Sequence, residues 1–397
     1  MAKTKPSKKQ PKKKNKSALH GTRGISSAAP KENPVRLFEQ ATNFLQTGQP
    51  VEALSLVERA LTITSTGSQN HLIGLNLCGE VHVELGDIDA ARRCFMQAVD
   101  LDPRGEVDDS IDGGAEKFLW LAQLSEEGGH DSVRWFERGA AILKHRIQSI
   151  DGNSRDENHE ILEELKKRLA HALCGTVEIY MTDLSWEEDA ESRCEILVTE
   201  ALLVAPNAPE CLQTLASIRI SQLRQEDARA ALKRSLELWR NLAPENALVP
   251  DFPARISLAR LLMEVEMETE ALQVLERMVL EDNQSIETWY LGGWCHYLLG
   301  TKPQTQVARD ENPNELQEQH LSILYASRVW LKQSLKLYEQ FEYEDEKLKA
   351  HAMELVQQLD QEIGISGEDD SEVSDEGDWE DASDHSDSGG DQEMADT

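Results

Sequence analysis

The sequence has few aromatic residues and no long apolar run. Aromatic residues make up 5% of its 397 residues and hydrophobic residues 39%. This composition is too poor in apolar residues for one large globular core. It fits an extended helical array, in which each unit buries one face against its neighbours. No apolar run approaches the roughly 18 residues of a membrane span, so no span is predicted.

The sequence also lacks a cysteine framework. Its six cysteines form no C-x-x-C pair and their spacing is irregular, so we predict no disulfides and expect a reducing compartment. Cys78 with His82, and His171 with Cys174, could each share one face of a helix. Two ligands do not make a zinc site, and a small buried cysteine beside a helix histidine is the commoner explanation. No metal and no cofactor are therefore predicted.

Catalytic motifs are missing as well. The sequence contains no phosphate-binding glycine loop, no G-x-S-x-G and no H-E-x-x-H. Paired acids such as Glu126-Glu127 are expected by composition alone in a chain this acidic. We therefore predict that the protein is not an enzyme.

Charge is distributed unevenly along the chain. The 41 Lys and Arg residues against 73 Asp and Glu residues give a net charge of −32. Residues 1–31 hold ten bases and no acid, residues 366–397 hold fourteen acids and no base, and residues 32–365 have a net charge of −28. Because the central part has no basic patch, we do not expect it to bind nucleic acid. Its field favours a cationic partner.

The two ends differ from the centre in composition. Residues 1–31 are predicted to be a disordered Lys-rich arm, with no apolar stretch that would indicate a secretory signal. This arm is either a nuclear import signal or a nonspecific basic tail, and its candidate import residues are Lys8, Lys9, Lys12, Lys13 and Lys14. Residues 366–397 are predicted to be a disordered acidic tail, which either carries kinase sites or only keeps the protein soluble.

Residues 32–365 contain a recurring helix-pair pattern. Apolar residues recur at spacings of three and four, and Gly or Pro marks the helix ends. Small residues recur where paired helices would cross, with a large residue between them. The clearest copy comprises Leu75, Gly79, Gly86, Ala91, Phe95, Ala98 and Pro103.

This pattern resembles the tetratricopeptide repeat, a helix–turn–helix unit of about 34 residues. Copies at 72–105 and 209–242 have near-standard length. Another at 160–206 has a long loop around Trp186, and the last pair is interrupted by polar residues 301–320. Residues 344–363 are predicted to be a capping helix. The predicted fold is an all-α, right-handed superhelix (α-solenoid) of about seven helix pairs.

The resemblance implies that the first helix of each pair lines a concave client-binding face. The residues placed there, which we call the predicted client face, are Asn76, Glu80, Glu84, Glu116, Gln123, Glu126, Glu127, Glu210, Gln213, Glu264, Glu287, Tyr290, Trp294 and Tyr297. The acidic members could pair with Lys and Arg of a client, and the aromatic ones could hold apolar or Arg anchors. The alternatives are a solvated face for the glutamates and inter-repeat packing for Tyr290 and Trp294.

The same face argues against one class of repeat protein. Tetratricopeptide co-chaperones of the heat-shock chaperones clamp an acidic carboxylate with cations, and only Arg260 matches here. The stretches PVRLFEQATNFLQTGQPVEALSLVERAL, ETWYLGGWCHYLLG and GDWEDASD instead make residues 32–397 similar to the fungal dedicated assembly chaperones of ribosomal protein L-four.

That resemblance implies a chaperone that captures newly made L-four, a protein of the large ribosomal subunit, through its long basic internal loop. It would accompany this client from the cytoplasm into the nucleus, with an import receptor as a possible partner, and release it at the pre-60S particle. The alternatives are a general tetratricopeptide scaffold and a chaperone of another basic client, such as a histone.

Overall fold

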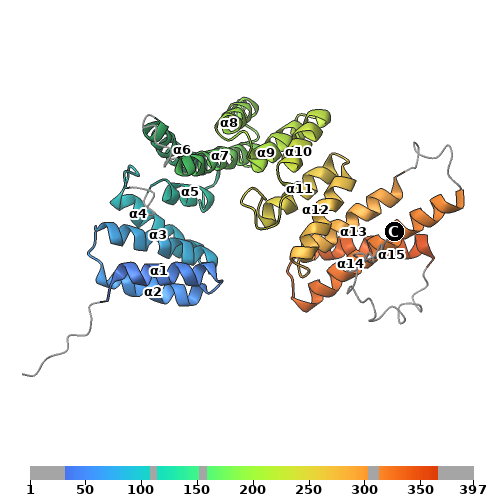
Figure 1. Ribbon diagram of the computed structural model, residues 1–397, viewed down its shortest axis with the longest axis horizontal. Helices are drawn as coiled ribbons and strands as arrows, with labels where there is room; N and C mark the ends of the chain where they lie inside the picture. Colours follow the sequence, from blue (N-terminus) through green and yellow to red (C-terminus); the bar gives the residue numbers. More distant parts are fainter. Residues whose placement is uncertain (1–31, 108–113, 152–158, 303–312, 365–397) are drawn as a thin grey trace, which may run out of the picture. The chain divides into compact units, whose positions relative to one another are not determined.

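The computed structural model describes residues 32–107, 114–151, 159–302 and 313–364. These residues form fifteen helices and no strand, as the all-α prediction requires (Figure 1). The helices group into two compact units, residues 1–114 and residues 115–397, each with most of its contacts inside itself. The Lys-rich arm with its import candidates and the acidic tail lie outside the described residues. None of the described helices is both long enough and apolar enough to cross a membrane.

The first unit is built from two helix pairs in its described residues. Its helices are α1 (Pro34–Gln46), α2 (Pro50–Ile63), α3 (Gln69–Glu84) and α4 (Ile88–Leu101). Local sequence sets their ends. The Asn33 side chain caps α1 by accepting a hydrogen bond from the Val35 amide at 3.1 Å, and Asp87 caps α4 in the same way. Gly48 and Gly86 turn the chain within each pair at positive φ, a conformation that glycine adopts without strain.

Small residues let the helices of the first unit approach each other. Ala41, Ala53 and Ala60 are fully buried where α1, α2 and α3 meet. At Gly79 on α3, an added Cβ would lie 2.5 Å from the ring of Phe95 on α4. The predicted alternation of small and large residues therefore marks the real helix crossings.

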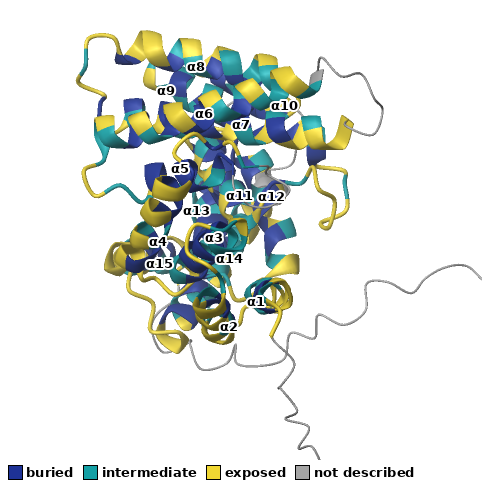
Figure 2. Ribbon diagram, turned by 90° about the vertical axis from the view of Figure 1, so that its left-hand side faces the viewer, coloured by how far each residue is buried: buried dark blue, intermediate teal, exposed yellow. Residues whose placement is uncertain are grey.

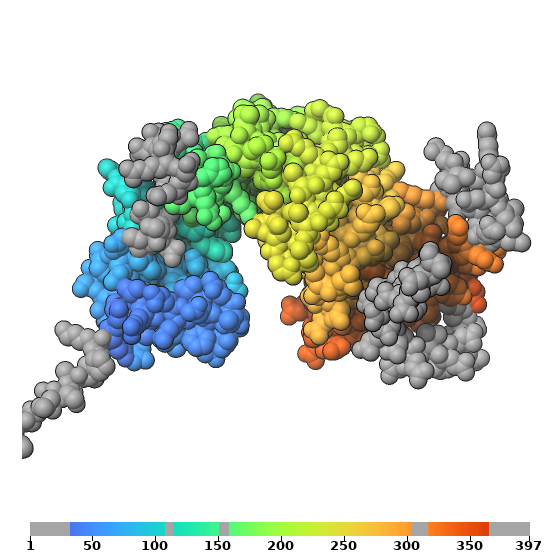
Figure 3. Space-filling view, viewed as in Figure 1, coloured from blue at the N-terminus to red at the C-terminus, as the bar shows by residue number. Residues whose placement is uncertain are grey.

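The second unit holds the remaining helices and a longer core. Its helices are α5 (Glu116–Gln123), α6 (Gly129–Asp151), α7 (His159–Met181), α8 (Ala190–Val204), α9 (Pro209–Ser221), α10 (Gln225–Trp239), α11 (Phe252–Glu264), α12 (Glu268–Glu281), α13 (Ile286–Thr301), α14 (Pro313–Gln340) and α15 (Glu346–Ile363). One buried apolar cluster runs from Ala216 on α9 to Leu359 on α15. Neighbouring helices of this unit pack side chain to side chain in the space-filling view (Figure 3).

Most helices have a buried and an exposed side, as Figure 2 shows in dark blue and yellow, whereas α5, α9 and α13 are exposed only at their last residue. Buried serines add polar contacts at the crossings. Ser235 on α10 donates a hydrogen bond to the Pro209 carbonyl of α9 at 3.0 Å. Ser327 on α14 donates one to the Gly293 carbonyl of α13 at 2.8 Å. These bonds satisfy both groups without a bulky side chain, so the helix axes stay close.

The helix pairing agrees with the sequence prediction in number and differs in some boundaries. Fourteen described helices form seven sequential pairs, and α15 follows as the predicted capping helix. The long loop near Trp186 is present as residues 182–189, between α7 and α8. The predicted interruption over 301–320 extends too far, because α14 already begins at Pro313. The right-handed superhelix stays a prediction.

Candidate client-binding face

In the first unit the predicted client face consists of three side chains on α3. Asn76, Glu80 and Glu84 are spaced four residues apart and so follow one side of the helix. Their exposure rises along it: Asn76 is 2% exposed, Glu80 is half-buried and Glu84 is exposed. Asn76 is therefore part of the core, and its assignment to a client-contacting surface is corrected. Glu84 is the accessible anion of this set.

In the second unit the predicted client face begins on α5. This helix is shorter than the prediction requires, because the prediction placed Glu126 and Glu127 on it. This helix ends at Gln123, so Glu126 and Glu127 lie in the turn before α6. The Ser125 hydroxyl organises that turn by donating to Asp131 at 2.8 Å and accepting from the Gly128 amide at 3.2 Å. Glu126 and Glu127 are exposed, but their placement on a helix face was wrong.

Arginines from neighbouring repeats pair with two of the predicted acids. Arg168 on α7 donates a hydrogen bond to Glu116 on α5. Arg260 on α11 does the same to Glu287 on α13. Each pair joins the first helices of consecutive repeats and cancels a charge that the sequence assigned to the client. A client cation at either carboxylate would therefore meet a charge that an arginine already balances.

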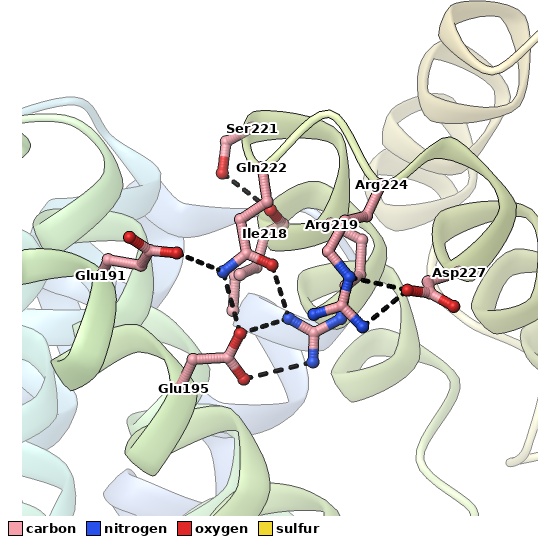
Figure 4. A network of polar contacts seen from close by, with 8 residues as sticks. All are labelled: Glu191, Glu195, Ile218, Arg219, Ser221, Gln222, Arg224 and Asp227. Atoms are coloured by element: carbon pink, nitrogen blue, oxygen red, sulfur yellow. Dashed lines mark hydrogen bonds and ion pairs between the residues drawn. The ribbon is translucent and has the colours of Figure 1, made fainter.

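A further polar network joins α8, α9 and the start of α10 (Figure 4). Glu195 accepts from both terminal nitrogens of Arg219, and the Gln222 amide donates to Glu195 and Glu191, each at 2.9 Å. The Arg219 bonds lower the pKa of the Glu195 carboxyl. Arg224 pairs with Asp227 at the start of α10. Arginines of this chain thus already pair with acids that charge counting leaves available to a client.

Two predicted residues lie on α9 and one ends α11. Gln213 is 6% exposed and belongs to the core, so its assignment to the client surface is corrected. Glu210 is half-buried in the first turn of α9, whereas Glu264 is exposed at the end of α11. Glu264 therefore joins Gln123, Glu126 and Glu127 as an exposed member in this unit.

The predicted aromatic residues of α13 are covered by the capping helix. The Tyr290 hydroxyl lies 2.7 Å from Nδ1 of His351 on α15, and the Trp294 ring meets the same imidazole edge-on, with centroids 5.0 Å apart. The Tyr297 hydroxyl donates to Gln358 at 2.7 Å. Tyr290 is only 9% exposed, and burial raises the pKa of its hydroxyl. Its role as a client anchor is corrected to helix packing, which was the alternative interpretation for Tyr290 and Trp294.

The accessible part of the predicted face is acidic and polar. Its exposed members are Glu84 in the first unit and Gln123, Glu126, Glu127 and Glu264 in the second. A single exposed ion pair contributes about 0–1 kcal/mol. Several together, in a chain with a negative field, would speed association with a basic segment and make it sensitive to salt.

Sequence reasoning missed the groups that neutralise or cover the predicted residues. Arg168 and His351 act across helices that only the fold brings together, and Arg260, which the sequence did place on this face, was not expected to pair with Glu287. It also missed Cys94, whose thiol joins Cys78 and His82 in a group with ligand atoms within 4.8 Å of one another. The sequence did hold a signal for Cys94: it directly precedes Phe95, as Cys78 directly precedes Gly79, and Gly79 and Phe95 belong to the same predicted helix pair.

The helix pairs match a known repeat family. The model of that family, described as tetratricopeptide repeat, matches residues 75–104, which lie in the α3–α4 pair. Sequential antiparallel helices with small residues at their crossings are the structural counterpart of this match. The fold is that of a tetratricopeptide-repeat protein.

Two curated relatives and one solved structure define the family more narrowly. A protein of Emericella nidulans named "Probable assembly chaperone of rpl4" is 52% identical over all of both chains. One of the same name from Schizosaccharomyces pombe is 35% identical over 77% of this chain and 84% of its own. The structure titled "Assembly Chaperone of RpL4 (Acl4) (Residues 1-338)" is 52% identical, covers 68% of this chain and 97% of its own, and has a TM-score of 0.60. The chain belongs to the family of these rpl4 assembly chaperones.

Proposed function

We propose that this protein is a dedicated chaperone of ribosomal protein L-four (rpl4). The observation that carries the proposal is its full-length relationship to the Emericella nidulans protein named as a probable assembly chaperone of rpl4. Exposed acids on the first helices and turns of its repeats support the proposal, because they complement a basic client. The proposed role is binding, with no catalytic step.

The chemistry of such a client explains why it needs an acidic partner. A loop that is built to penetrate ribosomal RNA is rich in Lys and Arg, and before assembly these charges have no RNA to neutralise them. Glu84, Glu127 and Glu264 are exposed carboxylates that would pair with such side chains. Binding would keep the loop soluble and away from other RNA.

Release would follow from competition between two anions. RNA carries a denser negative charge than the scattered carboxylates of the repeats, so the basic loop exchanges to its RNA site. In this proposal the complex forms in the cytoplasm and the client is handed over at the pre-60S particle in the nucleus. The lysines within 1–31 would serve as the signal for an import receptor.

The decisive experiment is purification of the tagged protein from its own cells at moderate salt, with quantification of the proteins that accompany it. We expect one dominant partner, rpl4, in about equal amount and with few other ribosomal proteins. Histones as the main partner, or a broad set of proteins in similar amounts, would contradict the client assignment and leave the repeat fold unaffected.

A further inference from the structure

Three side chains of the first unit bring soft metal ligands together between α3 and α4. Cys78 and His82 lie one turn apart on α3, and Cys94 lies on α4. One ligand atom from each residue lies within 4.8 Å of the other two. Cys78 is 5% exposed, while His82 and Cys94 are half-buried. The group therefore lies at the edge of the helix interface, where an ion could enter from solvent.

Helix packing places these residues. Gly79 has no side chain, so the ring of Phe95 fits against the backbone of α3. Cys78 directly precedes Gly79 and Cys94 directly precedes Phe95, so this contact brings the two thiols within 4.8 Å of each other. The site is thus built on two rigid helices at their closest approach, which is the arrangement that a preorganised metal site requires.

The histidine of this group has unused bonding capacity. Nδ1 of His82 is buried and has no hydrogen-bond partner within the described part of the chain. The nearest carboxylate oxygen in an ion pair with it, on Asp87, is 3.9 Å away, too far for a hydrogen bond. The other Asp87 oxygen accepts from the Ala90 amide at 3.0 Å. A buried imidazole nitrogen without a partner is costly and needs an explanation.

We propose that Cys78, His82 and Cys94 bind a zinc ion. Two thiolates and one imidazole are ligands that zinc prefers, at about 2.3 Å to sulfur and about 2.0 Å to nitrogen. Such bonds set the ligand atoms roughly 3.8 Å apart or less, so small side-chain rotations suffice from the observed separations. Water or the Asp87 carboxylate would supply the fourth ligand. Binding would release the thiol protons and fasten α3 to α4.

A second thiol pair in the chain provides a matched control. Cys174 on α7 and Cys211 on α9 are both buried, with sulfur atoms 3.6 Å apart. Among the described residues no histidine or carboxylate completes a three-ligand group with them. A double Cys174→Ser/Cys211→Ser variant removes one thiol more than Cys94→Ser does but leaves the proposed site intact.

The test uses the purified full chain, reduced and freed of metal with a chelator. We expect one equivalent of Zn²⁺ per chain after dialysis, by elemental analysis, and a higher melting temperature with Zn²⁺ than with chelator. Co²⁺ in its place should give thiolate charge-transfer absorption and the visible bands of a tetrahedral site. Cys94→Ser and His82→Ala should lose the stoichiometric metal, whereas the Cys174→Ser/Cys211→Ser control should retain it.

The proposal is overturned if the reduced wild-type chain retains no Zn²⁺, or if Cys94→Ser and His82→Ala retain as much as the wild type. Circular dichroism establishes that each variant is folded before its metal content is compared. His82→Ala leaves both thiols in place, so its metal content remains informative if Cys94→Ser does not fold. Formation of a Cys78–Cys94 disulfide by mild oxidant, without Zn²⁺ uptake by the reduced chain, would assign the pair to redox chemistry instead.

Discussion

The Tyr290 hydroxyl and Nδ1 of His351 are 2.7 Å apart, which ties α13 to the capping helix α15 across 61 positions of sequence. The Trp294 ring packs on the same imidazole. The aromatic end of the predicted client face is therefore part of the fold. The last helix closes the array by occupying a surface that would otherwise remain apolar.

Tyr290→Phe keeps the ring and removes this hydrogen bond. We expect a loss of about 1 kcal/mol in the free energy of unfolding, with faster amide hydrogen exchange concentrated in Glu346–Ile363. Tyr325→Phe is the control, because Tyr325 is 47% exposed on α14. Equal exchange rates in the two variants would contradict a role for the Tyr290–His351 contact in holding α15.

Charge reversal tests the exposed acids of the predicted client face. Replacing Glu84, Glu126 and Glu127 with Lys should weaken binding of a basic rpl4 segment at least tenfold while circular dichroism stays unchanged, because these side chains are exposed. Titration calorimetry at two salt concentrations measures the effect.

The control for this variant places the same charge change elsewhere. Glu58, Glu237 and Glu276 are exposed residues on the second helices α2, α10 and α12. Lysine at all three should reduce affinity only through the weaker overall field. Equal losses in both triple variants would mean that net charge, rather than the predicted face, holds the client.

Arg255 and Glu281 form an ion pair in the second unit that should govern acid stability. Arg255 is 5% exposed and donates two hydrogen bonds to the Glu281 carboxylate, at 2.8 and 2.6 Å. These bonds hold the pKa of Glu281 below its ordinary value of 4.5. The lowered pKa means that the pair stabilises the fold above about pH 4.5, and that this contribution is lost as the pH falls through the folded-state pKa.

Glu281→Gln should therefore lower the free energy of unfolding at pH 7 by about 2 kcal/mol, measured by denaturant titration. The difference from wild type should shrink as the pH falls from 4.5 through the lowered folded-state pKa of Glu281, because the wild-type carboxyl then becomes protonated. Glu226→Gln is the control, since Glu226 is 85% exposed beside Arg229 and its pair should contribute about 0–1 kcal/mol. A pH-independent difference would show that packing, not charge, underlies the Glu281 effect.

Gly79→Ala tests the close approach of α3 and α4. The new Cβ would lie 2.5 Å from the ring of Phe95, which is fully buried and has little room to move. We expect a loss of about 1–3 kcal/mol from this overpacking, measured by denaturant titration. In a Phe95→Leu background the same substitution should cost less, because the opposing ring is gone. An equal cost in both backgrounds would assign the effect to some other contact.

The sequence by itself determined the helix pairs, because the information for them is local. The spacing of apolar residues acts within a few positions of the chain. So do the helix caps, such as Asn33 and Asp87, and the turn glycines Gly48 and Gly86. The alternation of Gly79 with Phe95 also predicted where helices cross. These signals repeat along the chain, so their sum was sufficient for seven pairs and a final helix.

Only the tertiary structure decided what each polar or aromatic side chain of the face contacts. Arg168 neutralises Glu116 and Arg260 neutralises Glu287 across repeats, and α15 covers Tyr290. Cys94 reaches Cys78 and His82 only because two helices pack at Gly79. These contacts depend on which side chains of different helices come within bonding distance, and repeat spacing does not encode that. Charge and periodicity therefore predicted the kind of surface but not which of its predicted residues are accessible.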